Sequence, residues 1–286
     1  MSRIARFLEP IIRRLPIHRV SPRIVEMSQN ELLTGRTALV TGGTGGIGYE
    51  IAKSFVKAGA HVVITGRTQA KIDKVVAELR QATETDRIEG IEFNMKDVKS
   101  IPEFWERLVN LVPSHKIDIL VNNAGVTGDH FSTTTEDQYD NILYTNLKGV
   151  YFLCQRMGQY MIDNKIHGNI LNIASSSSIR PANSAYGVSK WGVRGLTEGL
   201  GRTLAPHDIV VTAIAPGQTV TNMMAGVSKD NIYHPTNLIK RYVLPCEIAN
   251  MAVILVSDMG RTIIGDTIYM TGGSGNVTNE DLPYDF

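Results

Sequence analysis

Thr41-Gly-Gly-Thr-Gly-Gly-Ile-Gly48 is the most informative segment of the sequence for the architecture, because an apolar segment lies on each side of it. Residues 37–41 are short and apolar, as in a buried strand, and residues 47–58 have the apolar spacing of a helix that Gly59 ends. Glycines in a strand-to-helix turn permit a positive φ and let an anionic group approach the N–H groups at the helix N-terminus. The segment therefore predicts a dinucleotide-binding turn.

Two glycine registers fit this turn. Gly43, Gly45 and Gly48 match G-x-G-x-x-G, whereas Gly42, Gly46 and Gly48 match the looser G-x-x-x-G-x-G. No Lys-Ser/Thr pair follows, which disfavours a nucleoside-triphosphate loop. The turn residues that we predict to bind the cofactor are Gly42, Thr44, Gly46, Ile47 and Gly48.

The rest of the chain alternates between strand-like and helix-like segments. The predicted strands are residues 61–65, 88–94, 117–122, 169–174, 209–215 and 267–270. The predicted helices are residues 69–82, 101–111, 147–163, 185–204 and 246–256. Continuous apolar strands that alternate with helices indicate a parallel sheet covered on both faces. We expect an α/β, doubly wound domain over residues 36–286, preceded by a basic N-terminal arm over residues 1–35.

The arm differs in composition from the domain. Residues 1–31 contain six arginines and three acidic residues, and they lack the apolar core and cleavage site of a secretory signal. Its apolar residues gather on one side of a helical wheel and are Ile4, Phe7, Leu8, Ile11, Ile12 and Leu15. Two hypotheses stay open: a peripheral contact with anionic lipid or a partner, or an arm packed on its own subunit or a neighbour.

Composition excludes several other classes. A net charge of +1 gives no general attraction to nucleic acid. Cys154 and Cys246 cannot form a disulfide framework, and we interpret them as buried thiols in a reducing, cytoplasmic protein. No apolar run approaches the ~20 residues of a membrane span. The seven histidines have no ligand-like spacing, so no metal site is expected.

A second segment, Asn172-Ile-Ala-Ser-Ser-Ser-Ser-Ile-Arg-Pro-Ala-Asn-Ser-Ala-Tyr-Gly-Val-Ser-Lys190, carries candidate chemistry. Tyr186 and Lys190 are four residues apart, so they share one face of a helix. A cation beside a phenol lowers the phenol's pKa by roughly 1–3 units from about 10, which suits general acid–base catalysis. A serine hydroxyl nearby could hydrogen-bond a carbonyl oxygen as it becomes an alkoxide.

The residues at the end of the second strand indicate which dinucleotide binds. Thr65-Gly66-Arg67-Thr68 has no acidic residue for a ribose 2′-hydroxyl, and Arg67 could pair with a 2′-phosphate. NADP is therefore expected, with NAD as the alternative. Asp97, after the third strand, either caps the next helix or contacts the adenine.

With the glycine turn, Asn122-Asn123-Ala124-Gly125 and Tyr186-Gly-Val-Ser-Lys190, the chain resembles the short-chain dehydrogenase/reductase family over residues 37–273. The resemblance implies a Rossmann-like sheet with Tyr186 as general acid/base. Lys190 would hold the nicotinamide ribose and lower the pKa of Tyr186, and Asn146 would position a proton-relay water. The other positions that the resemblance places beside the cofactor are Asn123, Gly125, Pro216, Gly217 and Thr221.

Two positions depart from the family pattern. Ser175 matches the catalytic serine but precedes Tyr186 by eleven residues instead of the commoner thirteen, and Ser176 is the alternate. Gly45 stands where many NADP-preferring relatives have a basic residue, so Arg67 would discriminate alone.

The implied function is hydride transfer between a nicotinamide and a small-molecule carbonyl or alcohol. A non-catalytic NADP(H)-binding sensor or a scaffold is the alternative. Residues 219–244 would set the substrate, with an acyl thioester, a sugar nucleotide and a hydroxylated ring system all open. Their apolar and basic side chains are Met223, Met224, Lys229, Tyr233, His234, Lys240 and Arg241. In the family, helices equivalent to residues 147–163 and 185–204 pack between subunits, which implies a homodimer or homotetramer.

Overall fold

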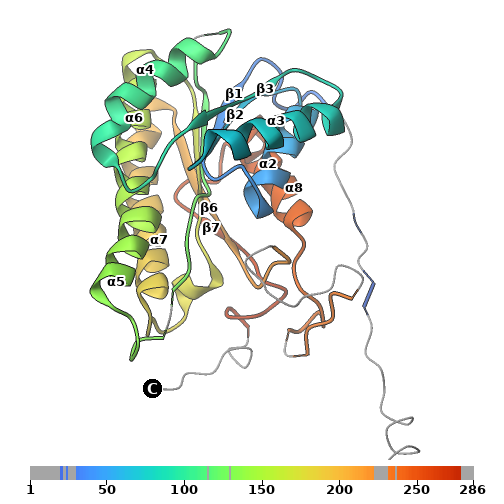
Figure 1. The fold of residues 1–286 in the computed structure, drawn as a ribbon, viewed down its shortest axis with the longest axis vertical. Coiled ribbons are helices and arrows are strands. Elements are labelled where there is room, and N and C mark those ends of the chain that lie inside the picture. Colours follow the sequence, from blue (N-terminus) through green and yellow to red (C-terminus); the bar gives the residue numbers. More distant parts are fainter. Residues whose placement is uncertain are drawn as a thin grey trace, which may run out of the picture.

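The computed structural model describes residues 20–21, 24, 30–114, 116–128, 130–221, 231–235 and 237–277 (Figure 1). Seven parallel strands form one sheet in the order β3-β2-β1-β4-β5-β6-β7. The strands are β1 Thr37–Val40, β2 His61–Gly66, β3 Ile88–Glu92, β4 Ile119–Asn122, β5 Asn169–Ile173, β6 Val210–Pro216 and β7 Thr267–Met270. The strand order reverses between β1 and β4, and such a reversal opens a crevice at the carboxyl ends of the strands.

Helices cover both faces of the sheet (Figure 1). The helices are α2 Gly46–Lys57, α3 Gln69–Thr83, α4 Ile101–Leu111, α5 Glu136–Leu143, α6 Gly149–Asp163, α7 Ala185–Leu204 and α8 Pro245–Val256. Side chains alternate along each strand, so Ala38 and Val40 pack with α2, α3 and α8, while Leu39 packs with α4 and α6. The predicted doubly wound parallel fold is confirmed.

The helix before residue 147 was not predicted. α5 continues through the π-helix η2 Tyr144–Lys148 into α6, so one helical segment extends well upstream of the expected start. Its sequence signal is a capping box: the Thr135 Oγ1 accepts from the Gln138 N–H at 3.3 Å, and the Gln138 Oε1 accepts from the Thr135 N–H at 2.9 Å. The predicted helices 101–111 and 185–204 and the predicted strand 267–270 have the observed bounds, and the other predicted elements differ by one or two residues at their ends.

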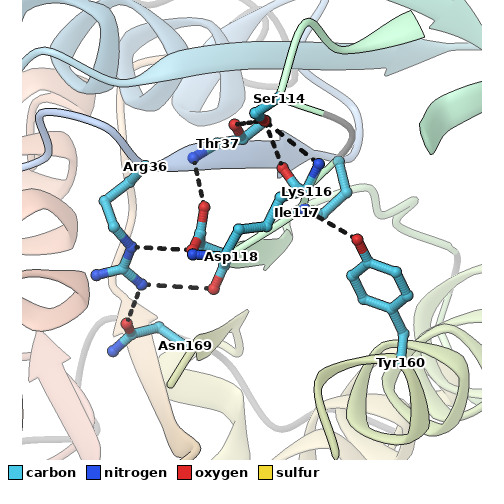
Figure 2. A network of polar contacts seen from close by, with 8 residues as sticks. All are labelled: Arg36, Thr37, Ser114, Lys116, Ile117, Asp118, Tyr160 and Asn169. Carbon is cyan, nitrogen blue, oxygen red and sulfur yellow. Dashed lines mark hydrogen bonds and ion pairs between the residues drawn. The ribbon is translucent and has the colours of Figure 1, made fainter. Parts of the chain in front are cut away.

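A cluster of charged and polar side chains around the buried Asp118 joins the amino ends of three strands (Figure 2). The Asp118 carboxylate is 2% exposed; it accepts from the Thr37 N–H at 2.9 Å and pairs with Lys116 Nζ at 2.7 Å. Arg36 lies 3.7 Å from the same carboxylate and donates to Asn169 Oδ1 at 2.9 Å. The cluster thus ties β1, β4 and β5 together at the edge opposite the crevice.

Both cysteines are buried, and neither forms a disulfide. Within the described ranges, no helix has the length and apolarity needed to cross a bilayer.

Candidate active site

The glycine turn between β1 and α2 selects one of the two registers. Gly42 and Gly46 have φ of 65° and 57°, which only glycine adopts readily, and a β-carbon on Gly48 would clash with Asn123 Nδ2. A β-carbon on Gly45 would meet nothing within 4 Å, so that position requires no glycine for packing. The constrained glycines are those of the G-x-x-x-G-x-G pattern, together with Gly43, whose β-carbon would lie 2.6 Å from Ile64.

Asn123 stabilises this turn through three hydrogen bonds. Its Nδ2 donates to the carbonyl oxygens of Thr41 at 3.0 Å and Gly42 at 3.1 Å. Its N–H donates to Thr41 Oγ1 at 3.0 Å. The structure therefore places Asn123 where it shapes the turn, and Thr41 is a contributor that the sequence analysis did not single out.

The N-terminus of α2 suits an anion. Gly45 caps the helix without a side chain, and the first turn contains no acidic residue. The first N–H groups of a helix have no intrahelical acceptor, and the helix dipole favours negative charge there. Thr221, at the end of the nicotinamide-side turn predicted from the sequence, lies beside this site: a β-carbon on Gly46 would be 3.4 Å from its Cγ2. These features fit a dinucleotide pyrophosphate.

The next two strands end in the residues predicted to contact the adenosine half. Arg67 follows β2, and its side chain is exposed. Asp97 is also exposed; it precedes the short 3-10 helix η1 Val98–Ser100, and its side chain makes no capping hydrogen bond. Asp97 stands at the N-cap position of η1, but its backbone carbonyl, not its carboxylate, accepts from Ser100, so the structure shows no capping by its side chain.

Ser175, Tyr186 and Lys190 meet at the carboxyl end of β5. Burial raises the pKa of Tyr186, and a hydrogen bond with Ser175 opposes that rise. Lys190 Nζ donates to the Ile173 carbonyl at 2.7 Å and lies 5.7 Å from the centroid of the Tyr186 ring. Burial lowers the pKa of Lys190 to about 8.

One expectation about this group needs correction. The sequence predicted that Lys190 lowers the pKa of Tyr186, but in this structure the pKa of Tyr186 is raised, because desolvation of the phenol outweighs the other contributions. The ammonium is held by the Ile173 carbonyl and is not in hydrogen-bond contact with the phenol.

The structure distinguishes the two candidate serines. Ser175 Oγ accepts from the Ser177 N–H at 3.1 Å as the cap of the 3-10 helix η3 Ser176–Ile179, and it is the serine hydrogen-bonded to Tyr186. Ser176 is buried, and no hydrogen bond joins its side chain to Tyr186 among the described contacts. The geometry thus favours Ser175.

Asn146 lies in the π-helix η2, a feature frequent at functional sites. Its Oδ1 accepts from the Val126 N–H at 2.8 Å, and its Nδ2 donates to the Val126 carbonyl at 2.9 Å. Nδ2 also lies 3.2 Å from Ser189 Oγ, which donates to the Tyr186 carbonyl at 2.7 Å. Asn146 therefore links the loop after β4, which includes Gly125, to the first turn of α7; Ser189 was not predicted.

The turn after β6 and the segment predicted to set the substrate are used partly for internal contacts. Pro216 ends β6, and the Gly217 N–H donates to the Met270 carbonyl at 3.0 Å. Arg241 makes a bidentate ion pair with Glu247, so its charge is not available to bind a substrate in this structure. Lys240 Nζ donates to the Pro235 carbonyl at 2.8 Å. Met223, Met224 and Lys229 lie outside the described residues.

Comparisons with known proteins agree with this geometry. The family model for short chain dehydrogenase matches residues 36–232. The chain belongs to this family. A 3-oxoacyl-[acyl-carrier-protein] reductase of Aquifex aeolicus is 36% identical and covers 84% of this chain and 98% of its own. A 3alpha-hydroxysteroid dehydrogenase of Mediterraneibacter gnavus is 32% identical, with 85% and 98% covered.

A solved structure, of a variant of actinorhodin polyketide ketoreductase with NADPH, is 29% identical with a TM-score of 0.76 and covers 86% of this chain and 99% of its own. This short-chain dehydrogenase is thus an NAD(P)-dependent oxidoreductase that interconverts a carbonyl and an alcohol on a small molecule. The predicted family and reaction type are confirmed, and the comparisons give no support to the non-catalytic alternative.

Proposed function

We propose that the protein reduces a small-molecule ketone with NADPH, using Tyr186 as the proton donor. The observation that carries the proposal is the meeting of Ser175, Tyr186 and Lys190 at the end of β5, at the same edge of the sheet as the glycine turn. A bound nicotinamide supplies the hydride, and the protein supplies orientation and proton transfer.

Each residue has an assigned role. Ser175 donates a hydrogen bond to the substrate oxygen, and Tyr186 gives that oxygen its proton. A phenol with a raised pKa is protonated at neutral pH, as a proton donor must be. Lys190 binds ribose hydroxyls with the N–H groups that the Ile173 carbonyl leaves free. Asn146 fixes the loop after β4 against α7, and we retain its role in positioning a relay water as part of the proposal.

The preference for NADP rests on Arg67. Its exposed guanidinium follows β2, and residues 65–68 contain no carboxylate that would repel a 2′-phosphate. The ketoreductase structure described with NADPH supports this choice. We place the adenine beside Asp97, and the nicotinamide beside Gly125, Pro216 and Gly217.

We propose a 3-oxoacyl thioester as the substrate class to test first, because the Aquifex relative is named for a reaction on one. Acetoacetyl-coenzyme A with NADPH is a suitable probe, and loss of NADPH absorbance reports turnover. Steroid ketones are the comparison, in view of the hydroxysteroid dehydrogenase relative. Turnover of the steroid alone would contradict the thioester assignment and leave the reductase assignment intact.

Matched variants test the catalytic assignments. Tyr186→Phe is expected to lower kcat by at least about 100-fold, since it removes the general acid. Ser175→Ala is expected to lower kcat by about 100-fold or more through the loss of a hydrogen bond to the developing alkoxide. Ser176→Ala, one residue away and also buried, should stay within about twofold of wild type. A larger loss at Ser176 than at Ser175 would refute the assignment.

We further propose that the enzyme is a homodimer or homotetramer assembled through α6 and α7. Large apolar side chains on this face are exposed, and contiguous patches of this kind mark interfaces. They are Tyr144, Tyr151, Phe152, Val188 and Trp191. A groove of about 460 Å³ beside them is lined in part by Phe131, Tyr139 and Val188.

We keep the division into an arm over residues 1–35 and a catalytic domain over residues 36–286 as a proposal. A cytoplasmic location is proposed with it, supported by the two buried cysteines, which do not form a disulfide. All of the apolar residues and arginines on which the lipid or partner hypothesis for the arm was based lie outside the described residues.

A further inference from the structure

Val20, a residue of the arm, contacts the substrate-side segment more than 200 positions further along the chain. The Val20 N–H donates to Asn231 Oδ1 at 3.1 Å, and the Val20 carbonyl accepts from the Ile232 N–H at 3.1 Å. The same Asn231 oxygen accepts from the Tyr233 N–H at 3.1 Å. Asn231 thus joins the arm and residues 231–233 through one side-chain amide.

Residues 231–233 are in turn bonded to the turn at the end of β6. The Tyr242 N–H donates to the Ile232 carbonyl at 2.9 Å, and the Val243 N–H donates to the Gln218 carbonyl at 2.9 Å. The Val220 N–H closes this set of contacts by donating to the Val243 carbonyl at 3.0 Å. A continuous hydrogen-bonded ladder therefore runs from Val20 to the Pro216–Thr221 turn, whose last residue lies beside Gly46.

An apolar cluster stabilises the ladder. Ile232, Leu244 and Cys246 are at most 8% exposed, and Val20, Val220 and Tyr242 pack against them. This cluster is separate from the two large cores that cover the sheet. Since it is small, the loss of one member should loosen the whole cluster, and Val20 is the member that comes from the arm.

We propose that the arm is a positioning element of the cofactor and substrate site, and that Val20 fixes the ladder which holds the Pro216–Thr221 turn. This inference rests on the proposed binding of a nicotinamide cofactor beside that turn. It gives the arm a function within its own subunit, which does not depend on lipid or on a partner.

Cys246 supplies a readout that needs no cofactor. Its thiol lies in the cluster against which Val20 packs, so release of the arm should increase its rate of reaction with the thiol reagent DTNB. Cys154 is 1% exposed in the core between the sheet and α6 and is expected to stay unreactive. Cys246→Ser identifies the thiol that is labelled.

The test compares Val20→Asp with Ile24→Asp in the full chain. Ile24 is four residues further along the same arm and is 64% exposed, so its substitution adds the same charge without breaking a packing contact. Val20→Asp is expected to accelerate Cys246 labelling by about tenfold, the factor that corresponds to the loss of the apolar contacts of one partly buried valine. It should also weaken NADPH binding, measured by fluorescence, by about 3- to 10-fold, while Ile24→Asp changes neither.

Val20→Ala should give a smaller effect in the same direction, and Val20→Ile should behave like wild type. Unchanged labelling in Val20→Asp would overturn docking of the arm. Faster labelling with unchanged NADPH binding would overturn the positioning role. If wild type binds NADH and not NADPH, the cofactor assignment fails, and the same comparison with NADH still decides the role of Val20.

Discussion

Lys190→Met removes a buried amine, and the lowered pKa of Lys190 gives the free-energy cost of burying its charge. Burial lowers the pKa of Lys190 from 10.5 to about 8, and the side chain is 5% exposed. At about 1.4 kcal/mol per pKa unit, the charged form is destabilised by about 3 kcal/mol relative to the unfolded chain. Because the folded pKa lies below the unfolded one, the folded state binds fewer protons between pH 8 and 10.5. Wild type should therefore gain stability as pH rises through this window.

Urea unfolding of wild type and Lys190→Met at pH values from 7 to 10.5 measures this term, with the protein concentration held constant in case subunits associate. The free energy of unfolding of wild type minus that of the variant should rise by about 3 kcal/mol across the range, because other titrating groups cancel in the difference. The lost hydrogen bond to the Ile173 carbonyl adds only a constant offset, since a neutral amine also donates.

Lys74→Met is the matched control, because the Lys74 side chain is 76% exposed and its difference from wild type should be flat. Parallel curves for wild type and Lys190→Met would refute the reasoning. At pH 7 a pKa of about 8 leaves Lys190 mainly charged, as its proposed role with the ribose requires.

Two further changes test other parts of the structure. Arg67→Asp should shift the ratio of kcat/KM for NADPH to that for NADH towards NADH by at least about tenfold, because it replaces a cation with an anion where the 2′-phosphate is proposed to bind; an unchanged ratio would remove Arg67 from cofactor selection. Asp118→Ala should lower the free energy of unfolding by about 3 kcal/mol, since it leaves the largely buried Arg36 guanidinium without its carboxylate. Its kcat should remain near wild type because the cluster lies at the opposite edge of the sheet, and a large fall in kcat at unchanged KM would show that the two edges are coupled.

Features set by neighbouring residues could be predicted from the sequence. The glycine turn, the i, i+4 placement of Tyr186 and Lys190 and the bounds of α7 all depend on local patterns, and the structure contains them. α5 also had a local signal, Thr135 and Gln138, which a search for apolar periodicity passes over because this helix buries only Ile142.

Features that depend on distant contacts could not be predicted. The hydrogen bond from Lys190 to Ile173 requires that α7 pack against the end of β5, and it determines where the ammonium lies relative to Tyr186. Similarly, the sequence analysis placed Arg241 among the basic side chains near a substrate, but in the structure it forms an ion pair with Glu247 in the first turn of α8. The pKa of Tyr186 was predicted in the wrong direction for the same reason: sequence spacing reveals a neighbouring charge but not the extent of desolvation.

The π-helix at Tyr144–Lys148 constrains how this part of the chain can change in length. A π-turn holds one residue more than an α-turn, so deletion of a single residue there would leave an ordinary α-helix in which α5 and α6 keep nearly the same relative orientation. The bulge that carries Asn146 would be lost, so its side chain would no longer face both Val126 and Ser189, although every residue of the site would still be present. A single-residue deletion in this turn should therefore leave the protein folded but lower its activity, whereas one in the loop before Thr135 should affect activity less, and a deletion scan would map the difference.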